Sequence, residues 1–164
     1  MEIIQSHTGH SFEVCDETYF HLTSPNDFLM HNVRLYHGLL PSVSVNAQTP
    51  GLTEMTTTYA GLNVHPDKER LWEAIRAADY ANKPSRLKTF YCFQNANDAE
   101  MANAAWFANQ RKMLEIRPAA LSTIGSFDAK WLNCHSDLWE ENAHRYWSGD
   151  MTDEARLFPR TSRP

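Results

Sequence analysis

The chain has 164 residues, enough for one domain that buries roughly 70% of the surface of its unfolded form. Hydrophobic residues make up 42% and charged residues 21%, which excludes an intrinsically disordered protein. The net charge is −5 with neutral histidines, so binding along a nucleic-acid polymer is disfavoured, although a local basic patch is allowed. We therefore expect a single globular domain over residues 1–164.

The cysteines and the hydropathy of the chain bear on its location. Cys15, Cys92 and Cys134 form neither a paired spacing nor a CxxC motif. The chain begins without a basic segment followed by an apolar one, and no window holds eighteen apolar residues. These features predict a cytoplasmic protein with no membrane span.

The first elements are a strand and a long irregular segment. Residues 18–23 are aromatic and β-branched and end at the turn cluster Ser24-Pro25-Asn26-Asp27, which predicts a strand and a turn. Between residues 34 and 63 no helical or strand period persists. A loop of that length inside a domain is usually functional, so we expect a binding lid there.

Three helices are predicted. Pro66 at a first helical position and an apolar stripe through Trp72 and Ile75 predict a helix over about 66–81. An Asn97-x-x-Glu100 capping box predicts a helix over about 98–110 that buries Met101, Ala104, Ala105 and Ala108. A similar box at Asp137 predicts a helix over 137–147 that ends at Gly149.

Further short strands are expected between these helices. Alternating side chains predict a strand over 87–93, and a partial alternation predicts another over 126–133. Residues 112–116 are expected to form a short strand that ends before Pro118. The tail from 150 to 164 is expected to be flexible. The fold class is therefore α+β, with short strands interrupted by about three helices.

Two clusters suggest metal or nucleophile chemistry, and both have a simpler interpretation. His7-x-x-His10 is the tightest histidine pair, but a metal site needs three or four ligands and no third partner is evident, so we predict no metal. Cys134-His135 would place its side chains on opposite faces of a strand, which favours a structural cysteine.

Three sequence segments resemble known families. Tyr19-Phe20-His21-Leu22-Thr23-Ser24 is similar to the opening strand of ADP-ribosyltransferases of the diphtheria-toxin and poly-ADP-ribose-polymerase branch, in which a His, an aromatic residue and a Glu lie on three strands. Pro84-Ser85-Arg86 and Arg145-Tyr146-Trp147-Ser148-Gly149-Asp150 resemble an uncharacterised bacterial domain family grouped with ADP-ribosyltransferase-like folds. The resemblance covers roughly residues 18–150.

The resemblance implies a split, strongly bent β-sheet that binds nicotinamide adenine dinucleotide (NAD). His21 would take the first position of the triad and Tyr91 the aromatic one. Thr23, on the same strand as His21, would also contact NAD. Ser85 and Arg86 would contact the pyrophosphate, since a guanidinium matches phosphate oxygens. The simpler alternatives are a core histidine at 21, a turn serine at 85 and a solvated arginine at 86.

A carboxylate is the remaining requirement, because breaking the nicotinamide–ribose bond builds positive charge on the sugar. Glu154 matches by chain order, and Glu115 is the fallback in a strand. The family pattern continues into an acidic strand, whereas this chain runs from Glu154 into a basic tail, so the catalytic glutamate is the point at which it departs from the family.

The leading functional hypothesis is an NAD-dependent ADP-ribosyltransferase of bacterial or phage origin, with NAD as substrate and an unknown protein, nucleic-acid or small-molecule acceptor. One alternative is a catalytically inactive acidic protein that binds or inhibits a host or partner protein, suggested by the net charge of −5. Another is an NAD-cleaving glycohydrolase, because a site that stabilises an oxocarbenium ion also lets water attack.

Overall fold

The computed structural model describes residues 1–5, 9, 11–24, 30, 65–120 and 122–152. Its contacts divide the chain into two compact units, Met1–Thr57 with Lys88–Ser122 and Thr58–Leu87 with Thr123–Pro164. In the described part, three α-helices accompany two antiparallel two-stranded sheets. The predicted mixture of short strands and three helices is confirmed, and the single domain over 1–164 stays a prediction.

A hairpin that the sequence analysis did not predict opens the first unit. Strand β1 (Glu2–Gln5) pairs antiparallel with β2 (Ser11–Val14), with Glu2 opposite Val14. Most of its side chains are exposed, and Ile3 is 72% exposed. Because neither face of this hairpin is well buried, the usual alternation of apolar and polar residues is missing from its sequence.

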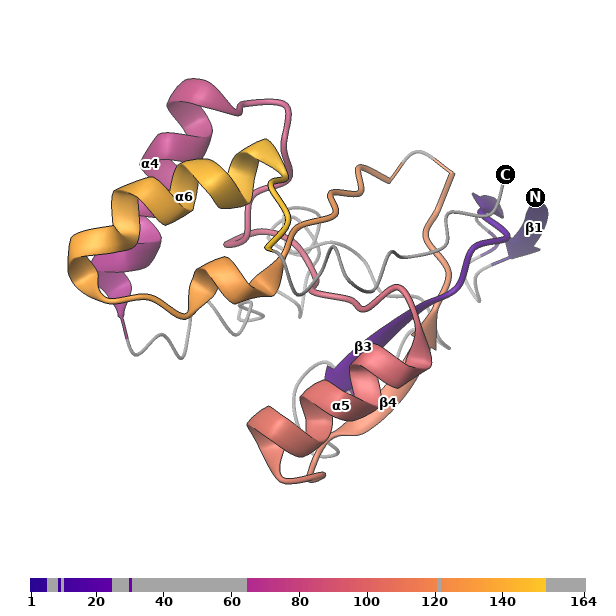
Figure 1. Cartoon of the computed structure of the whole chain (residues 1–164). Coiled ribbons are helices and arrows are strands. Elements are labelled where there is room, and N and C mark those ends of the chain that lie inside the picture. The colour runs from indigo at the N-terminus through magenta and orange to yellow at the C-terminus, as the bar shows by residue number, and fades with distance from the viewer. Residues whose placement is uncertain (6–8, 10, 25–29, 31–64, 121, 153–164) are drawn as a thin grey trace. The chain divides into compact units, whose positions relative to one another are not determined.

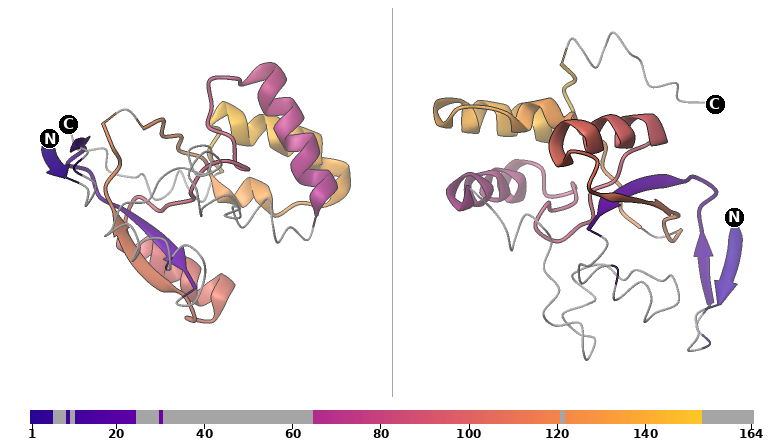
Figure 2. Two further views of the ribbon diagram at one scale, coloured as in Figure 1. Left: turned by 180° about the vertical axis from the view of Figure 1, so that it is seen from behind. Right: turned by 90° about the horizontal axis from the view of Figure 1, so that it is seen from below.

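The central sheet of the first unit joins two predicted strands. Strand β3 (Tyr19–Thr23) pairs antiparallel with β4 (Lys112–Ile116), and both predictions are confirmed, β4 with the same bounds. The register places His21 opposite Leu114 and Phe20 opposite Glu115. Helix α5 (Ala96–Phe107) covers one face of this pair, as the front and back views show (Figures 1 and 2).

Helix α5 begins two residues earlier than predicted, and this changes which residues it buries. Asn95 is the N-cap, since its side chain accepts a hydrogen bond from the Asp98 backbone N–H at 2.8 Å. The predicted box at Asn97 and Glu100 is therefore wrong by two residues. Ala99 and Ala102 are buried, whereas the predicted core residues Met101, Ala104, Ala105 and Ala108 are exposed.

The strand predicted over 87–93 is wrong except at its last residue. Only Phe93 pairs with β3, through a bridge in which Phe20 and Phe93 exchange both backbone hydrogen bonds at 2.9 and 2.7 Å. The chain passes from the second unit to the first between Leu87 and Lys88. Alternating side chains do not by themselves form a ladder, because a strand also needs a partner strand in register.

The second unit is built on two helices that lie side by side, α4 (Pro66–Asp79) and α6 (Trp139–Ser148) (Figures 1 and 2). Both predicted helices are confirmed, and Gly149 ends α6 with a φ of 87°, a left-handed conformation that glycine adopts without strain. The buried core between them contains Trp72, Ile75, Ala143, Tyr146 and Trp147.

The strand predicted over 126–133 is wrong, because this segment contains the 3-10 helix η1 (Ala129–Leu132). The carboxylate of Asp128 accepts from the Lys130 backbone N–H at 2.9 Å and from the Thr152 N–H and hydroxyl at 2.8 and 2.6 Å. Asp128 thereby caps a helical turn, and such local hydrogen bonds compete with strand pairing. A second 3-10 helix, η2 (Ser136–Leu138), leads into α6.

Candidate functional site

His21 lies in the middle of β3, and the segment that precedes α5 holds its ring. The imidazole Nδ1 is 2.6 Å from the backbone carbonyl oxygen of Tyr91, and the ring of Phe90 is edge-on to it at 6.1 Å between centroids. Because a carbonyl oxygen only accepts, Nδ1 carries the proton. In the neutral ring Nε2 is then a hydrogen-bond acceptor, which suits a ligand hydroxyl group.

The resemblance assigned both His21 and Tyr91 to the NAD site. The two residues are in contact, and the contact is made by the backbone carbonyl oxygen of Tyr91. The Tyr91 ring packs edge-on against Phe93 at 5.2 Å, and Phe93 contacts Trp106 of α5 at 6.3 Å. Thr23, also predicted to contact NAD, is only 2% exposed at the end of β3. This part of the first unit offers one oriented imidazole beside a cluster of aromatic rings.

Glu115, the fallback carboxylate, does not share a sheet face with His21. Residues directly opposite each other in an antiparallel pair point to the same side, and successive residues alternate. Glu115 is opposite Phe20, while His21 is opposite Leu114. The exposed Glu115 side chain and the imidazole therefore project from opposite faces of the β3–β4 pair.

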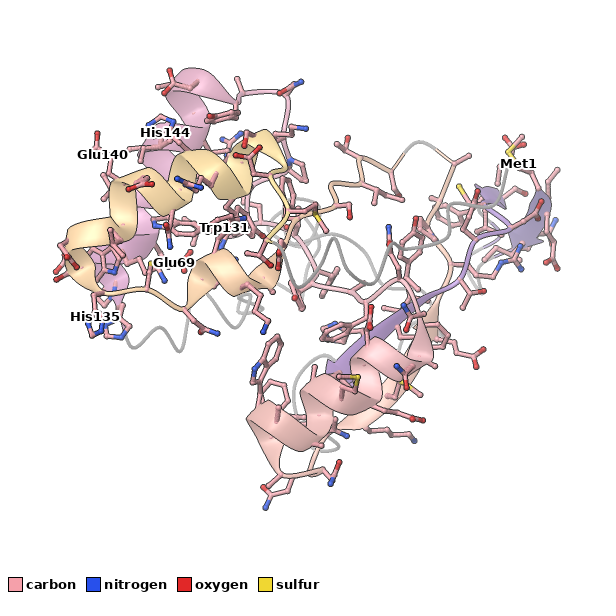
Figure 3. All side chains as sticks on the ribbon, viewed as in Figure 1. Met1, Glu69, Trp131, His135, Glu140 and His144 are labelled. Atoms are coloured by element: carbon pink, nitrogen blue, oxygen red, sulfur yellow. The ribbon has the colours of Figure 1, made fainter. Side chains whose placement is uncertain are left out.

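Ser85 and Arg86 belong to the second unit, where both are held by carboxylates of α4. Arg86 is 7% exposed, and it donates to the two Glu69 oxygens at 3.1 and 3.2 Å and to the Tyr146 hydroxyl at 3.3 Å. Ser85 donates to Glu73 at 2.9 Å. Figure 3 labels Glu69 on α4. The solvated arginine considered as an alternative is wrong, because Arg86 is buried.

A lysine accompanies this ion pair in the interior. Lys68 is 8% exposed, its ammonium lies 5.0 Å from the centroid of the Trp72 ring, and it donates to the backbone carbonyl of Leu132. Burial is the main cause of a shift in the pKa of Lys68, and it lowers this pKa. The charges of Cys134 and Glu69 raise it, but by less. Lys68, Glu69 and Arg86 therefore form a buried cluster of charged side chains in the second unit.

Sequence reasoning missed this buried cluster, although a signal for it exists. Lys68 and Glu69 precede the buried Trp72 by one helical turn, so they continue the stripe that Trp72 and Ile75 begin. Charged residues on the buried face of a helix usually have partners. The sequence by itself did not show that Arg86 is that partner.

Some predicted features lie outside the described residues. These are Glu154, His7, His10 and the 34–63 loop. Within the described ranges, no group of three or more His, Cys, Asp or Glu side chains is arranged to hold a metal ion. Among the helices that the structure describes, none is both long and apolar enough to cross a membrane.

Cys92 follows Tyr91, and its thiol has an unusual acidity. Burial raises the pKa of Cys92 to about 11. Because a thiolate fraction of roughly 0.1% follows at pH 8, we expect iodoacetamide to alkylate Cys92 very slowly in the folded protein. Peptide mapping by mass spectrometry after timed labelling from pH 7 to 11 would show the rate rising about tenfold per pH unit up to the pKa.

The same shift predicts an alkaline loss of stability. The folded state holds the Cys92 proton to higher pH than the unfolded state does. The protonated thiol therefore makes its full contribution to the free energy of unfolding below about pH 9, and this contribution is lost between pH 9 and 11. Replacing Cys92 with alanine should flatten the stability profile in that window. Labelling of Cys92 as fast in the native protein as in concentrated urea would contradict the expectation.

Comparisons with known proteins assign the chain to a family. A family model described as "Protein of unknown function (DUF2441)" matches residues 30–159. No curated protein and no solved structure matches the chain significantly. Because the match spans most of the chain, including β4 and all three α-helices, the protein belongs to the DUF2441 family.

Proposed function

We propose that this protein is an NAD-dependent ADP-ribosyltransferase whose dinucleotide site is centred on His21 in the first unit. The observation that carries the proposal is the 2.6 Å contact between Nδ1 of His21 and the Tyr91 carbonyl oxygen. It orients the imidazole with Nε2 as the acceptor, and a ribose hydroxyl of NAD is a donor that such a nitrogen binds.

The arrangement of the sheet supports the same proposal. Among the described residues, strand β3 pairs with β4 along one edge, and Phe20 forms a bridge with Phe93 along the other. A strand with pairing partners on both edges is compatible with the centre of a bent sheet. The rings of Phe90, Tyr91 and Phe93 lie on the segment that contacts His21, and aromatic rings are a surface on which a nicotinamide ring stacks.

The reaction requires a base and charge stabilisation. The bond between nicotinamide and the ribose carbon breaks, nicotinamide leaves with the electron pair, and the acceptor nucleophile bonds to that carbon and loses its proton. By chain order alone, the family resemblance implies that Glu154 is the carboxylate that stabilises the cationic ribose, and this residue lies outside the described ones. Glu115 is the weaker candidate because it projects from the face opposite His21.

We do not assign Arg86 to the pyrophosphate of NAD, although the resemblance implied that role. Its Nε and both terminal nitrogens already donate to Glu69 and Tyr146 in the second unit. Releasing it toward a phosphate would leave the buried Glu69 carboxylate without that counter-ion. Ser85 is likewise bonded to Glu73.

The test is a measurement of NAD cleavage and label transfer by the full chain. The purified protein is incubated with NAD labelled in the adenosine part, together with a bacterial lysate, and both nicotinamide release and labelled products are followed. Loss of one hydrogen bond predicts that His21→Ala lowers the rate about tenfold. Loss of the charge predicts about a hundredfold for Glu154→Gln.

His135→Ala is the matched control, because His135 is an exposed histidine of the second unit. It should leave NAD cleavage unchanged. Nicotinamide release without labelled products would identify the glycohydrolase alternative. Failure of the wild-type protein to bind NAD would contradict the proposal, and a stable protein partner whose capture survives His21→Ala would favour the acidic binding protein.

A further inference from the structure

A depression at the C-terminal end of α5 has the chemistry of a ligand site. It is an open surface depression with a volume of about 570 Å³. It is lined by Ser24, directly after β3, by residues 104–108 at the end of α5, and by Gln110 and Arg111. All of these residues belong to the first unit.

The turn after α5 gives this depression a fixed rim. Ala108 and Asn109 adopt left-handed backbone conformations with φ of 49° and 61°, which residues other than glycine seldom adopt. The Asn103 side chain holds the chain beyond them, accepting from the Arg111 N–H at 3.1 Å and donating to the Arg111 carbonyl at 3.0 Å. The backbone that carries Arg111 is therefore anchored to α5.

The apolar part of the depression suits a flat ring. Trp106 is 50% exposed, and Ala104 and Ala105 beside it carry side chains too small to obstruct access. Because about half of the indole is exposed to solvent, the aromatic ring of a ligand can stack on it without disturbing the packing of the protein. Base-on-tryptophan stacking uses such a surface and tolerates any base.

The polar part of the depression carries a positive charge. The Arg111 guanidinium lies 4.8 Å from the centroid of the Phe107 ring. Across the described ranges, ion pairs form at arginines 70, 76, 86, 117 and 145, and none forms at Arg111. In a chain with a net charge of −5, an arginine without a carboxylate partner at a pocket rim favours an anion.

We propose that this depression binds a nucleoside monophosphate, with the base against Trp106 and the phosphate at Arg111. Gln110 supplies an amide group among the lining residues. A mononucleotide suits the site better than a nucleic-acid polymer, because the net negative charge of the chain repels a polyphosphate. The inference is independent of the proposed ADP-ribose transfer, since it requires neither His21 nor Glu154.

Calorimetric titration of the full chain with AMP, adenosine and inorganic phosphate tests the site. We expect AMP to bind saturably, adenosine to bind about tenfold more weakly, and phosphate alone not to saturate over the same range. Trp106→Ala should weaken AMP binding at least about fivefold through loss of stacking. Arg111→Ala should weaken it about tenfold, and the effect should shrink at high salt.

Arg70→Ala is the matched control, because Arg70 is an exposed arginine paired with Asp67 in the other unit. It should bind AMP as the wild type does. Thermal melts confirm that each variant is folded. Absence of saturable AMP binding, or AMP affinity unchanged in folded Trp106→Ala and Arg111→Ala, would overturn the proposal.

Discussion

Replacing Arg86 with alanine is expected to lower the free energy of unfolding by about 3–5 kcal/mol, as when one partner of a buried ion pair is removed. Arg86 and Glu69 are 7% and 10% exposed in their side chains, and two hydrogen bonds join them. The variant leaves the Glu69 carboxylate buried without its counter-ion. It also removes the donor to Tyr146 and the contact with the Trp72 ring. Urea denaturation followed by circular dichroism measures the loss.

Two further variants separate the charge effect from lost packing. Combining Arg86→Met with Glu69→Leu removes both charges and keeps apolar volume, so it should be more stable than Arg86→Ala. Arg70→Ala, at the exposed pair with Asp67, should change stability by less than about 1 kcal/mol. A stability of Arg86→Ala within that margin of the wild type would show that the ion pair contributes little.

Trp147→Ala is the second substitution with a large expected effect, a loss of about 3–5 kcal/mol. Trp147 is 0% exposed between α4 and α6, and it packs edge-on against Phe127 and Tyr146 at 5.2 and 4.8 Å. Its indole N–H donates to the Trp72 carbonyl at 3.1 Å. Alanine would leave a large cavity and a buried carbonyl without that donor. The midpoint of urea unfolding and the melting temperature report the effect.

The contribution of the indole N–H can be measured separately. Trp147→Phe keeps most of the ring volume and loses the donor, so it should cost about 1–3 kcal/mol, less than alanine. Trp106→Ala is the matched control on an exposed tryptophan, and it should leave stability within about 1 kcal/mol of the wild type. Equal effects at positions 106 and 147 would contradict the placement of the core.

The role of Arg86 also affects how activity data are interpreted. Because Arg86→Ala is expected to disturb the α4–α6 core, a loss of NAD cleavage in that variant would follow from unfolding alone. The contacts of His21 with the Tyr91 carbonyl oxygen and the Phe90 ring lie within the first unit, whereas the α4–α6 core belongs to the second. Variants at His21 and Glu154 are therefore the informative ones for the proposed ADP-ribosyltransferase activity.

Local sequence signals correctly predicted the elements whose ends depend on nearby residues. Pro66 marks the start of α4, and Gly149 ends α6, because these residue types have strong backbone preferences of their own. The short strand expected over Lys112–Ile116, ended by Pro118, is β4 with its observed bounds. The proximity of His21 and Tyr91 was expected from the family resemblance, and the structure brings them together through a backbone carbonyl.

Tertiary packing decided the features that depend on distant partners. Arg86 pairs with Glu69, seventeen positions earlier, and no local pattern selects that partner among the carboxylates of α4. The face on which Glu115 projects follows from its register with Phe20, which only strand pairing sets. The 87–93 segment had a strand pattern, but within the described residues only Phe93 pairs with a strand. The sequence alone determined the start of α4, the end of α6 and the bounds of β4, because backbone preferences act over a few residues. The tertiary structure decided burial, pairing and side-chain orientation, because these depend on contacts between residues far apart in the chain.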